Sequence, residues 1–193
     1  VKNLFYNVPA RRKFLKKDRV ELRHCVDEFH RVAIVHTSIE WIMKSDGKTL
    51  FHLKPEPLRR RINGIFGRKF DERLVPIEEE TEAVKVSGFI LKPEFAKKKR
   101  GEQFFFVNGR FIKSPYLHNA LREAFEEVLT AEHHPGYFLH LQVDPQGLDV
   151  NIHPTKTEVK FEDERTIYAV LRSAVRHAIG QFNVAPAIDF DAE

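Results

Sequence analysis

Cysteine, methionine and tryptophan each occur once in this chain of 193 residues. The single cysteine, Cys25, excludes an internal disulfide and fits a reducing compartment. Its spacing from Val26 and Phe29 favours the buried face of a helix, so we expect a structural thiol. The only methionine is Met43, and the sequence opens at Val1 in the middle of a pattern. We therefore expect a piece of a longer polypeptide.

Several motifs of catalysis and ligand binding are also missing. The sequence contains no GxxxxGK[ST] phosphate loop, no GxGxxG after a strand and no GxSxG nucleophile elbow. His133 and His134 are adjacent and should point apart, and no Cys or HExxH pattern joins them or His140, so we expect no metal site. No apolar run approaches the roughly 20 residues of a membrane span, and no signal peptide opens the chain. We expect no membrane partner.

The composition, 42% hydrophobic and 31% charged, describes a soluble globular protein with a formal net charge of +4. Its basic residues are clustered, and several such clusters could meet a polyanion. A solvated face without a partner is the alternative for any single cluster. The clusters are Arg11–Lys13, Lys16–Lys17, Arg59–Arg61, Arg68–Lys69 and Lys97–Arg100.

Hydrophobic periodicity predicts an α/β (α+β) chain with a mostly antiparallel sheet backed by helices. We place a boundary near residue 20: residues 1–20 are a remnant of a preceding unit, 21–184 are the main domain and 185–193 are a loosely ordered tail. The predicted helices cover 10–36, 58–66, 117–128 and 163–182. The predicted strands cover 39–43, 49–53, 84–91, 104–107, 111–113, 137–143 and 148–152, with 137–143 and 148–152 forming a hairpin.

The segment Asp149–Phe161 contains the most specific pattern. An alternating strand stops at His153-Pro154, a short loop presents Lys156, and a second alternating segment follows. Pro154 restricts the backbone beside the lysine. A lysine held in this way is suited to an anionic group such as a terminal phosphate, although an ordinary exposed lysine is the alternative. His153 is interpreted as a hydrogen-bonded structural residue, with an acid or base role as the alternative.

Three segments resemble signatures of the MutL mismatch-repair proteins. LFYNVPARRKFL at residues 4–15 resembles LFYNxPARxKFL, and FFVNGR at 105–110 resembles the family's FFVNGR. DVNIHPTKTEVKF at 149–161 is similar to DVNVHPxKxEVRF, with Ile152 for Val and Lys160 for Arg. The three motifs occur in the family's order over nearly the whole chain.

The resemblance implies a split ATP site. In MutL proteins an upstream domain of the GHKL type binds ATP and Mg²⁺ and supplies a catalytic glutamate. The following domain has the ribosomal protein S5 domain 2 fold, and its HPxK lysine, here Lys156, contacts the γ-phosphate as the catalytic and ATP-binding residue. The family fold also implies a left-handed βαβ crossover, an exception to the usual rule. This chain alone should hold no cofactor and be inactive.

The resemblance also implies weak, sequence-independent DNA binding in a basic groove that forms when ATP closes a homodimer. Partners would be DNA, the mismatch-recognition protein MutS and downstream repair factors, at the bacterial nucleoid in the cytoplasm or in a eukaryotic nucleus. Ser114-Pro115 stands where some members carry another basic residue. The candidate DNA contacts are Arg110, Lys113, Arg165, Lys97, Lys98, Lys99 and Arg100.

Two further interpretations remain open. S5-like folds also occur in RNA-associated proteins, and a fold does not determine a function. The chain could therefore be a stand-alone nucleic-acid-binding module without a role in ATP hydrolysis. It could also be a docking domain for repair partners, in which case the basic clusters would be replaceable without loss of DNA binding.

Overall fold

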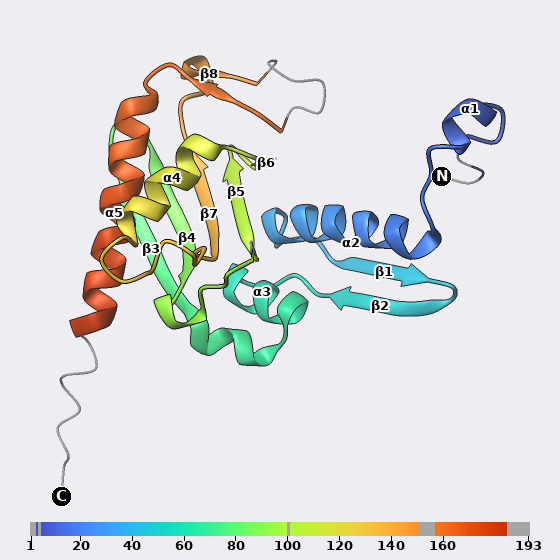
Figure 1. Cartoon of the computed structure of the whole chain (residues 1–193), viewed down its shortest axis with the longest axis horizontal. Coiled ribbons are helices and arrows are strands. Elements are labelled where there is room, and N and C mark those ends of the chain that lie inside the picture. Colours follow the sequence, from blue (N-terminus) through green and yellow to red (C-terminus); the bar gives the residue numbers. More distant parts are fainter. Residues whose placement is uncertain (1–2, 4, 100, 151–156, 185–193) are drawn as a thin grey trace, which may run out of the picture.

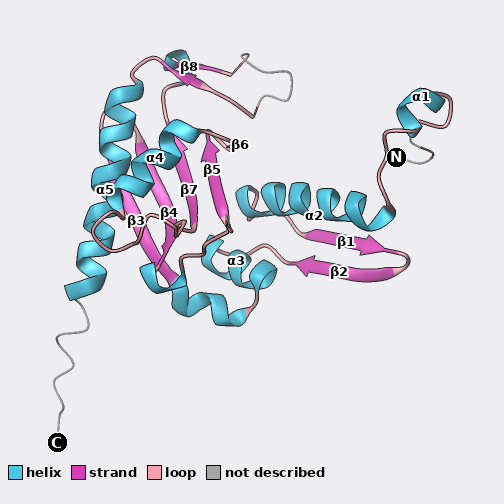
Figure 2. Ribbon diagram, viewed as in Figure 1, coloured by secondary structure: helices cyan, strands magenta, loops and turns pink. Residues whose placement is uncertain are grey.

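The computed structural model describes residues 3, 5–99, 101–150 and 157–184. A five-stranded mixed sheet in the order β3-β4-β7-β5-β6 forms the body, and two helices pack on one of its faces (Figure 1). Figure 2 shows a helix and a two-stranded sheet that project together from the opposite side. The body contains β3 (Leu74–Glu80), β4 (Lys85–Leu91), β5 (Gln103–Val107), β6 (Arg110–Ile112), α4 (Pro115–Ala124), β7 (Tyr137–Gln142) and α5 (Glu164–Val184).

The remaining elements lie before the body, between β4 and β5, and between β7 and α5. The projecting unit consists of α2 (Asp18–Val35) and the hairpin of β1 (Trp41–Ser45) with β2 (Lys48–Leu53). Short helices and strands make up the rest: α1 (Pro9–Arg12), α3 (Leu58–Phe66), η1 (Arg68–Arg73), η2 (Pro93–Phe95), η3 (Pro145–Gly147), β8 (Leu148–Asp149) and β9 (Lys160–Phe161).

The α/β class and the mostly antiparallel sheet are confirmed, but the predicted pairing of 137–143 with 148–152 is wrong. β7 lies between β4, antiparallel, and β5, parallel, so both of its edges are already bonded. After β7 the side chain of Asp144 accepts a hydrogen bond from the backbone of Gln146 and opens η3. The chain is thereby turned away, and β8 pairs with β9 instead.

The single helix predicted over 10–36 is two helices. α1 ends at Arg12 and has no buried residue, so no apolar face supports its continuation. The side chain of Glu21 then accepts a hydrogen bond from the backbone of Lys16, just before α2 begins. The prediction of a buried Cys25 is also wrong, because the thiol is exposed on α2.

The two faces of the sheet contribute to two separate hydrophobic clusters. Alternate residues of one strand point to opposite faces, so Phe105 and Leu139 join the cluster beneath α4 and α5. Phe106 and Phe138 join the other cluster, with Ile62 from α3 and residues from the end of α2. The second cluster therefore connects the projecting unit to the body. Among the described residues, no helix has the length and apolar content to cross a membrane.

A buried arginine connects α3 to the projecting unit. Arg61 is 0% exposed, and its guanidinium donates at 2.9 Å to the carbonyl groups of Ala33, Thr37, Ile39 and Lys54. Burial lowers the pKa of Arg61, while the nearby carboxylate of Glu56 opposes the shift. One side chain thus joins residues at and after the end of α2 to Lys54 after β2, and its loss would remove all four hydrogen bonds.

Replacing Arg61 by methionine should lower the free energy of unfolding by about 3 kcal/mol or more, because buried polar groups lose their partner. Denaturant unfolding of this chain, followed by circular dichroism, measures the change. Arg60→Met is the matched control, since Arg60 is exposed in the next position of the same helix. An equal loss in both variants would contradict the role of the buried guanidinium.

A second stability prediction concerns His140 on β7. Its ring stacks on Phe106 with centroids 4.8 Å apart, and burial lowers its pKa to about 4. The unfolded chain takes up a proton below pH 6.5, whereas the folded chain does not until about pH 4, so stability falls as the pH drops through this window. Between pH 7 and 5 the wild type should lose about 2 kcal/mol more than His140→Leu. Identical losses in both proteins would exclude His140 as the cause.

Candidate functional site

The turn between β5 and β6 is the Asn-Gly turn that the sequence predicted. Asn108 and Gly109 have φ values of +47° and +78°, as expected for a type I′ turn. Arg110 begins β6 and is exposed. β6 is the last strand of the sheet order, so one of its edges is open to other groups.

The end of β6 contacts the segment that follows the predicted phosphate lysine. The backbone N–H of Lys113 donates to the carbonyl oxygen of Thr157 at 2.7 Å. Thr157 directly follows Lys156 in the sequence, so the described residue nearest to the lysine is bonded to the sheet edge. Lys156 itself lies outside the described residues, and so do His153 and Arg100.

A hollow of about 360 Å³ lies between α2 and the Asn-Gly turn. Arg110 and Thr157 both line it. Thr157 belongs to the segment 149–161 that contains Lys156, called the lysine segment below, so one candidate DNA contact lies beside this segment. Arg31 from α2 lines the other wall; its guanidinium lies 4.2 Å from the centre of the Phe111 ring and forms an ion pair with Glu28. The contact with Phe111 holds this arginine against the sheet edge.

A groove of about 440 Å³ continues from Arg31 along β6 to α4. Its cations are Lys113, Arg122 and Arg31, of which Arg31 is already paired with Glu28, and no acidic residue is found among the described residues that line it. A groove with several cations and no carboxylate favours an anion. Its other lining residues are Gly101, Gln103, Phe105, Phe111, Ile112, Ser114, Pro115, His118, Asn119 and Tyr137.

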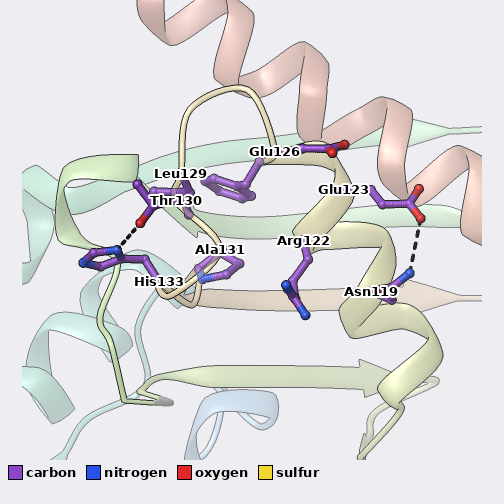
Figure 3. Close-up of a pocket in the computed structure, with 10 residues that line it drawn as sticks. Asn119, Arg122, Glu123, Glu126, Leu129, Thr130, Ala131 and His133 are labelled. Atoms are coloured by element: carbon purple, nitrogen blue, oxygen red, sulfur yellow. Dashed lines mark hydrogen bonds between the residues drawn. The ribbon is translucent and has the colours of Figure 1, made fainter.

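Arg122 and Asn119 line both this groove and a further hollow of about 310 Å³, whose lining residues are drawn in Figure 3. Its guanidinium points away from the carboxylates of Glu123 and Glu126 in Figure 3. The carboxylate of Glu123 accepts hydrogen bonds from Nδ2 of Asn119 at 3.2 Å and from the guanidinium of Arg172 at 3.1 Å. Within the part of the chain that the structure describes, no ion pair joins Arg122 or Lys113 to a carboxylate.

The lysines of the loop before β5 have a different environment. Lys97 pairs with Glu102 at 2.8 Å, and Lys98 pairs with Glu132 at 3.0 Å. The backbone of Lys97 also bridges to His134, at the end of β5 opposite to the Asn-Gly turn. Five residues of strand span about 16 Å. The structure therefore does not bring this loop together with Arg110.

Two other predicted contacts stand apart from the groove. Lys99 is exposed in the same loop as Lys97. Arg165 is exposed in the first turn of α5, and it is not among the described residues that line the groove or the hollow. Hydrogen bonds from Thr166 lower the pKa of Asp163, and the charge of Arg165 contributes a smaller part.

Sequence reasoning missed Arg31 and Arg122. Each lies on a helix far from the three family motifs, and only the packing of α2 and α4 against the sheet edge brings them to the groove. The polar face of an amphipathic helix gives no local sign of such a contact. Among the described residues, no group of three or more His, Cys, Asp or Glu side chains could hold a metal ion.

The fold defines an α/β domain of the ribosomal protein S5 domain 2 type. Residues 62–180 match the family described as DNA mismatch repair protein, C-terminal domain. The chain belongs to the MutL family of DNA mismatch repair proteins.

Individual relatives agree with this assignment. The chain is 58% identical over its whole length to the DNA mismatch repair protein MutL of Christiangramia forsetii, and it covers 31% of that protein. The chain thus spans about a third of the length of the curated relatives it matches.

Solved structures share the fold. The N-terminal domain of a DNA repair protein superposes with a TM-score of 0.73 at 20% identity, over 94% of this chain and 60% of that one. A mutant of the Aquifex aeolicus MutL ATPase domain gives a TM-score of 0.65 at 22% identity, over 91% and 60%. At these identities the likeness establishes the fold.

Proposed function

We propose that this chain is the transducer part of a MutL-type ATPase and supplies Lys156 to an ATP site formed mainly by another domain. The observation that carries the proposal is the 2.7 Å hydrogen bond from Lys113 to Thr157. This bond attaches the residue next to Lys156 to a strand of the sheet. A lysine that acts on a phosphate needs such support, because positioning is the protein's main contribution to phosphoryl transfer.

The ammonium group of Lys156 would neutralise charge that develops on the γ-phosphate during hydrolysis. In the family, ATP and Mg²⁺ are held by an upstream domain, and Mg²⁺ there offsets phosphate charge. The described residues of this chain would attach the segment that contains Lys156 to the edge of the sheet. We expect the chain on its own to neither bind nor hydrolyse ATP appreciably.

The second part of the proposal is DNA binding along the β6 edge. Lys113 and Arg122 line a groove whose described lining residues include no carboxylate, and Arg110 lies beyond it at the turn. Cations of this kind contact phosphates of any sequence, so binding should be weak, non-specific and strongly dependent on salt. Because Lys97 and Lys98 are already paired with carboxylates, we assign them a smaller part than Lys113 and Arg122.

Lys113, directly after β6, takes part in both the proposed DNA binding and the attachment of the lysine segment. Lys113 faces the groove with its side chain and binds Thr157 with its backbone, so DNA and the lysine segment contact the same residue. This arrangement supports coupling between ATP binding, closure of a homodimer and DNA binding, with MutS and later repair factors as partners. The site of action would be the nucleoid of a bacterial cytoplasm.

In the longer protein, Lys156→Ala should lower the turnover number for ATP by about 100-fold, the scale on which loss of one stabilising charge in a preorganised site is measured. Steady-state hydrolysis assays test this. Lys160→Ala, an exposed lysine on β9 of the same segment, is the matched control and should keep wild-type turnover. Wild-type turnover in Lys156→Ala would contradict the proposed role.

For DNA, Arg122→Gln and Lys113→Gln should each weaken binding of duplexes of any sequence and reduce the slope of log K against log salt by about 1. Lys98→Gln is the control, because Glu132 already neutralises Lys98. Fluorescence anisotropy at several salt concentrations measures both quantities. If the groove variants bind DNA as tightly as the wild type, the result contradicts the DNA-binding groove and favours a docking domain for repair partners.

A further inference from the structure

The side chain of Asn108, in the Asn-Gly turn, contacts Val143, the residue that directly follows β7. Nδ2 of Asn108 donates to the carbonyl oxygen of Val143 at 3.0 Å, and the Val143 N–H donates to Oδ1 at 3.0 Å. The backbone N–H of Asn108 donates to Leu141 at 2.9 Å. The parallel ladder of β5 and β7 ends at Val107 and Leu141. The side chain of Asn108 therefore continues the ladder past the end of both strands.

The turn itself does not require an amide. The β1–β2 hairpin has an almost identical turn at Asp46-Gly47, with φ values of +49° and +75°. There the aspartate side chain only accepts a hydrogen bond from Ser45. A carboxylate accepts but does not donate, whereas an amide does both. The amide of Asn108 is thus needed for Val143 and not for the turn.

Val143 is the first residue of an arm, residues 143–162, that contains Lys156. The arm contains η3 and a β8–β9 ladder of only two residue pairs, Leu148 with Phe161 and Asp149 with Lys160. A ladder this short has little stability alone. The orientation of the arm therefore depends on how it is attached to the body.

Two kinds of attachment hold the arm. Leu148, Val159 and Phe161 pack against the core beneath α4 and α5, but burial of apolar surface does not specify a direction. Two directional contacts among the described residues come from the β5–β6 hairpin and the residue after it: Asn108 binds Val143, and the backbone of Lys113 binds Thr157. One contact precedes Lys156 in the sequence and the other follows it.

We propose that Asn108 is a positioning residue for Lys156. It binds Val143, at the start of the arm, on the same side of the sheet where the backbone of Lys113 binds Thr157. This inference rests on the proposed role of Lys156 at the γ-phosphate. Asn108 itself is assigned no contact with ATP.

The test uses the full-length ATPase with Asn108→Gly. Glycine keeps the left-handed φ of the turn and removes both side-chain bonds to Val143. The turnover number should fall about tenfold, since small displacements of a reacting group cost this much or more. The KM for ATP should stay unchanged, because another domain holds the nucleotide. A loss of fold would raise KM as well and lower the unfolding midpoint.

Asp46→Gly is the matched control, because it makes the same change in the equivalent turn of the other hairpin. It should keep wild-type turnover, and equal turnover in the two glycine variants would overturn the inference. The double variant Asn108→Gly/Lys156→Ala should be no slower than Lys156→Ala alone. A further, additive loss would show that Asn108 does not act through Lys156, whereas wild-type turnover in Lys156→Ala alone would instead remove the proposed function.

Discussion

The parallel pairing of β5 with β7 is the constraint on which the rest of the structure depends. Parallel neighbours cannot be joined by a tight turn, so the chain must leave β5, form β6 and α4, and return along the sheet to β7. This route makes β6 an edge strand and places α4 beside it, which creates the groove. The same pairing puts the Asn-Gly turn next to the exit of β7, where the arm with the lysine segment begins.

Ion pairs distinguish basic residues that look alike in the sequence. Lys97 and Lys98 form ion pairs with Glu102 and Glu132, and only the fold brings Glu132 near Lys98. Arg122 has two glutamates close to it in sequence, yet its guanidinium points away from both (Figure 3), and neither is among the described residues that line the groove. The number of cations in a segment is therefore a poor guide to its part in binding an anion.

Local patterns predicted α3, α4, α5 and both two-residue turns, because helical periodicity and Asn-Gly or Asp-Gly pairs act over a few residues. Two of the failures were non-local. The partner of β8 depends on β7 being bonded on both edges, and the break before α2 depends on a first turn that buries nothing. The groove cations from α2 and α4 could not be predicted, because helix packing brings them to the sheet edge.

A crystal structure of the longer protein with a non-hydrolysable ATP analogue tests the central claim most directly. The account predicts that Nζ of Lys156 lies within hydrogen-bonding distance of a γ-phosphate oxygen while Asn108 remains bonded to Val143 and Lys113 to Thr157. A γ-phosphate bound entirely by other residues, with Lys156 directed to solvent, would contradict it.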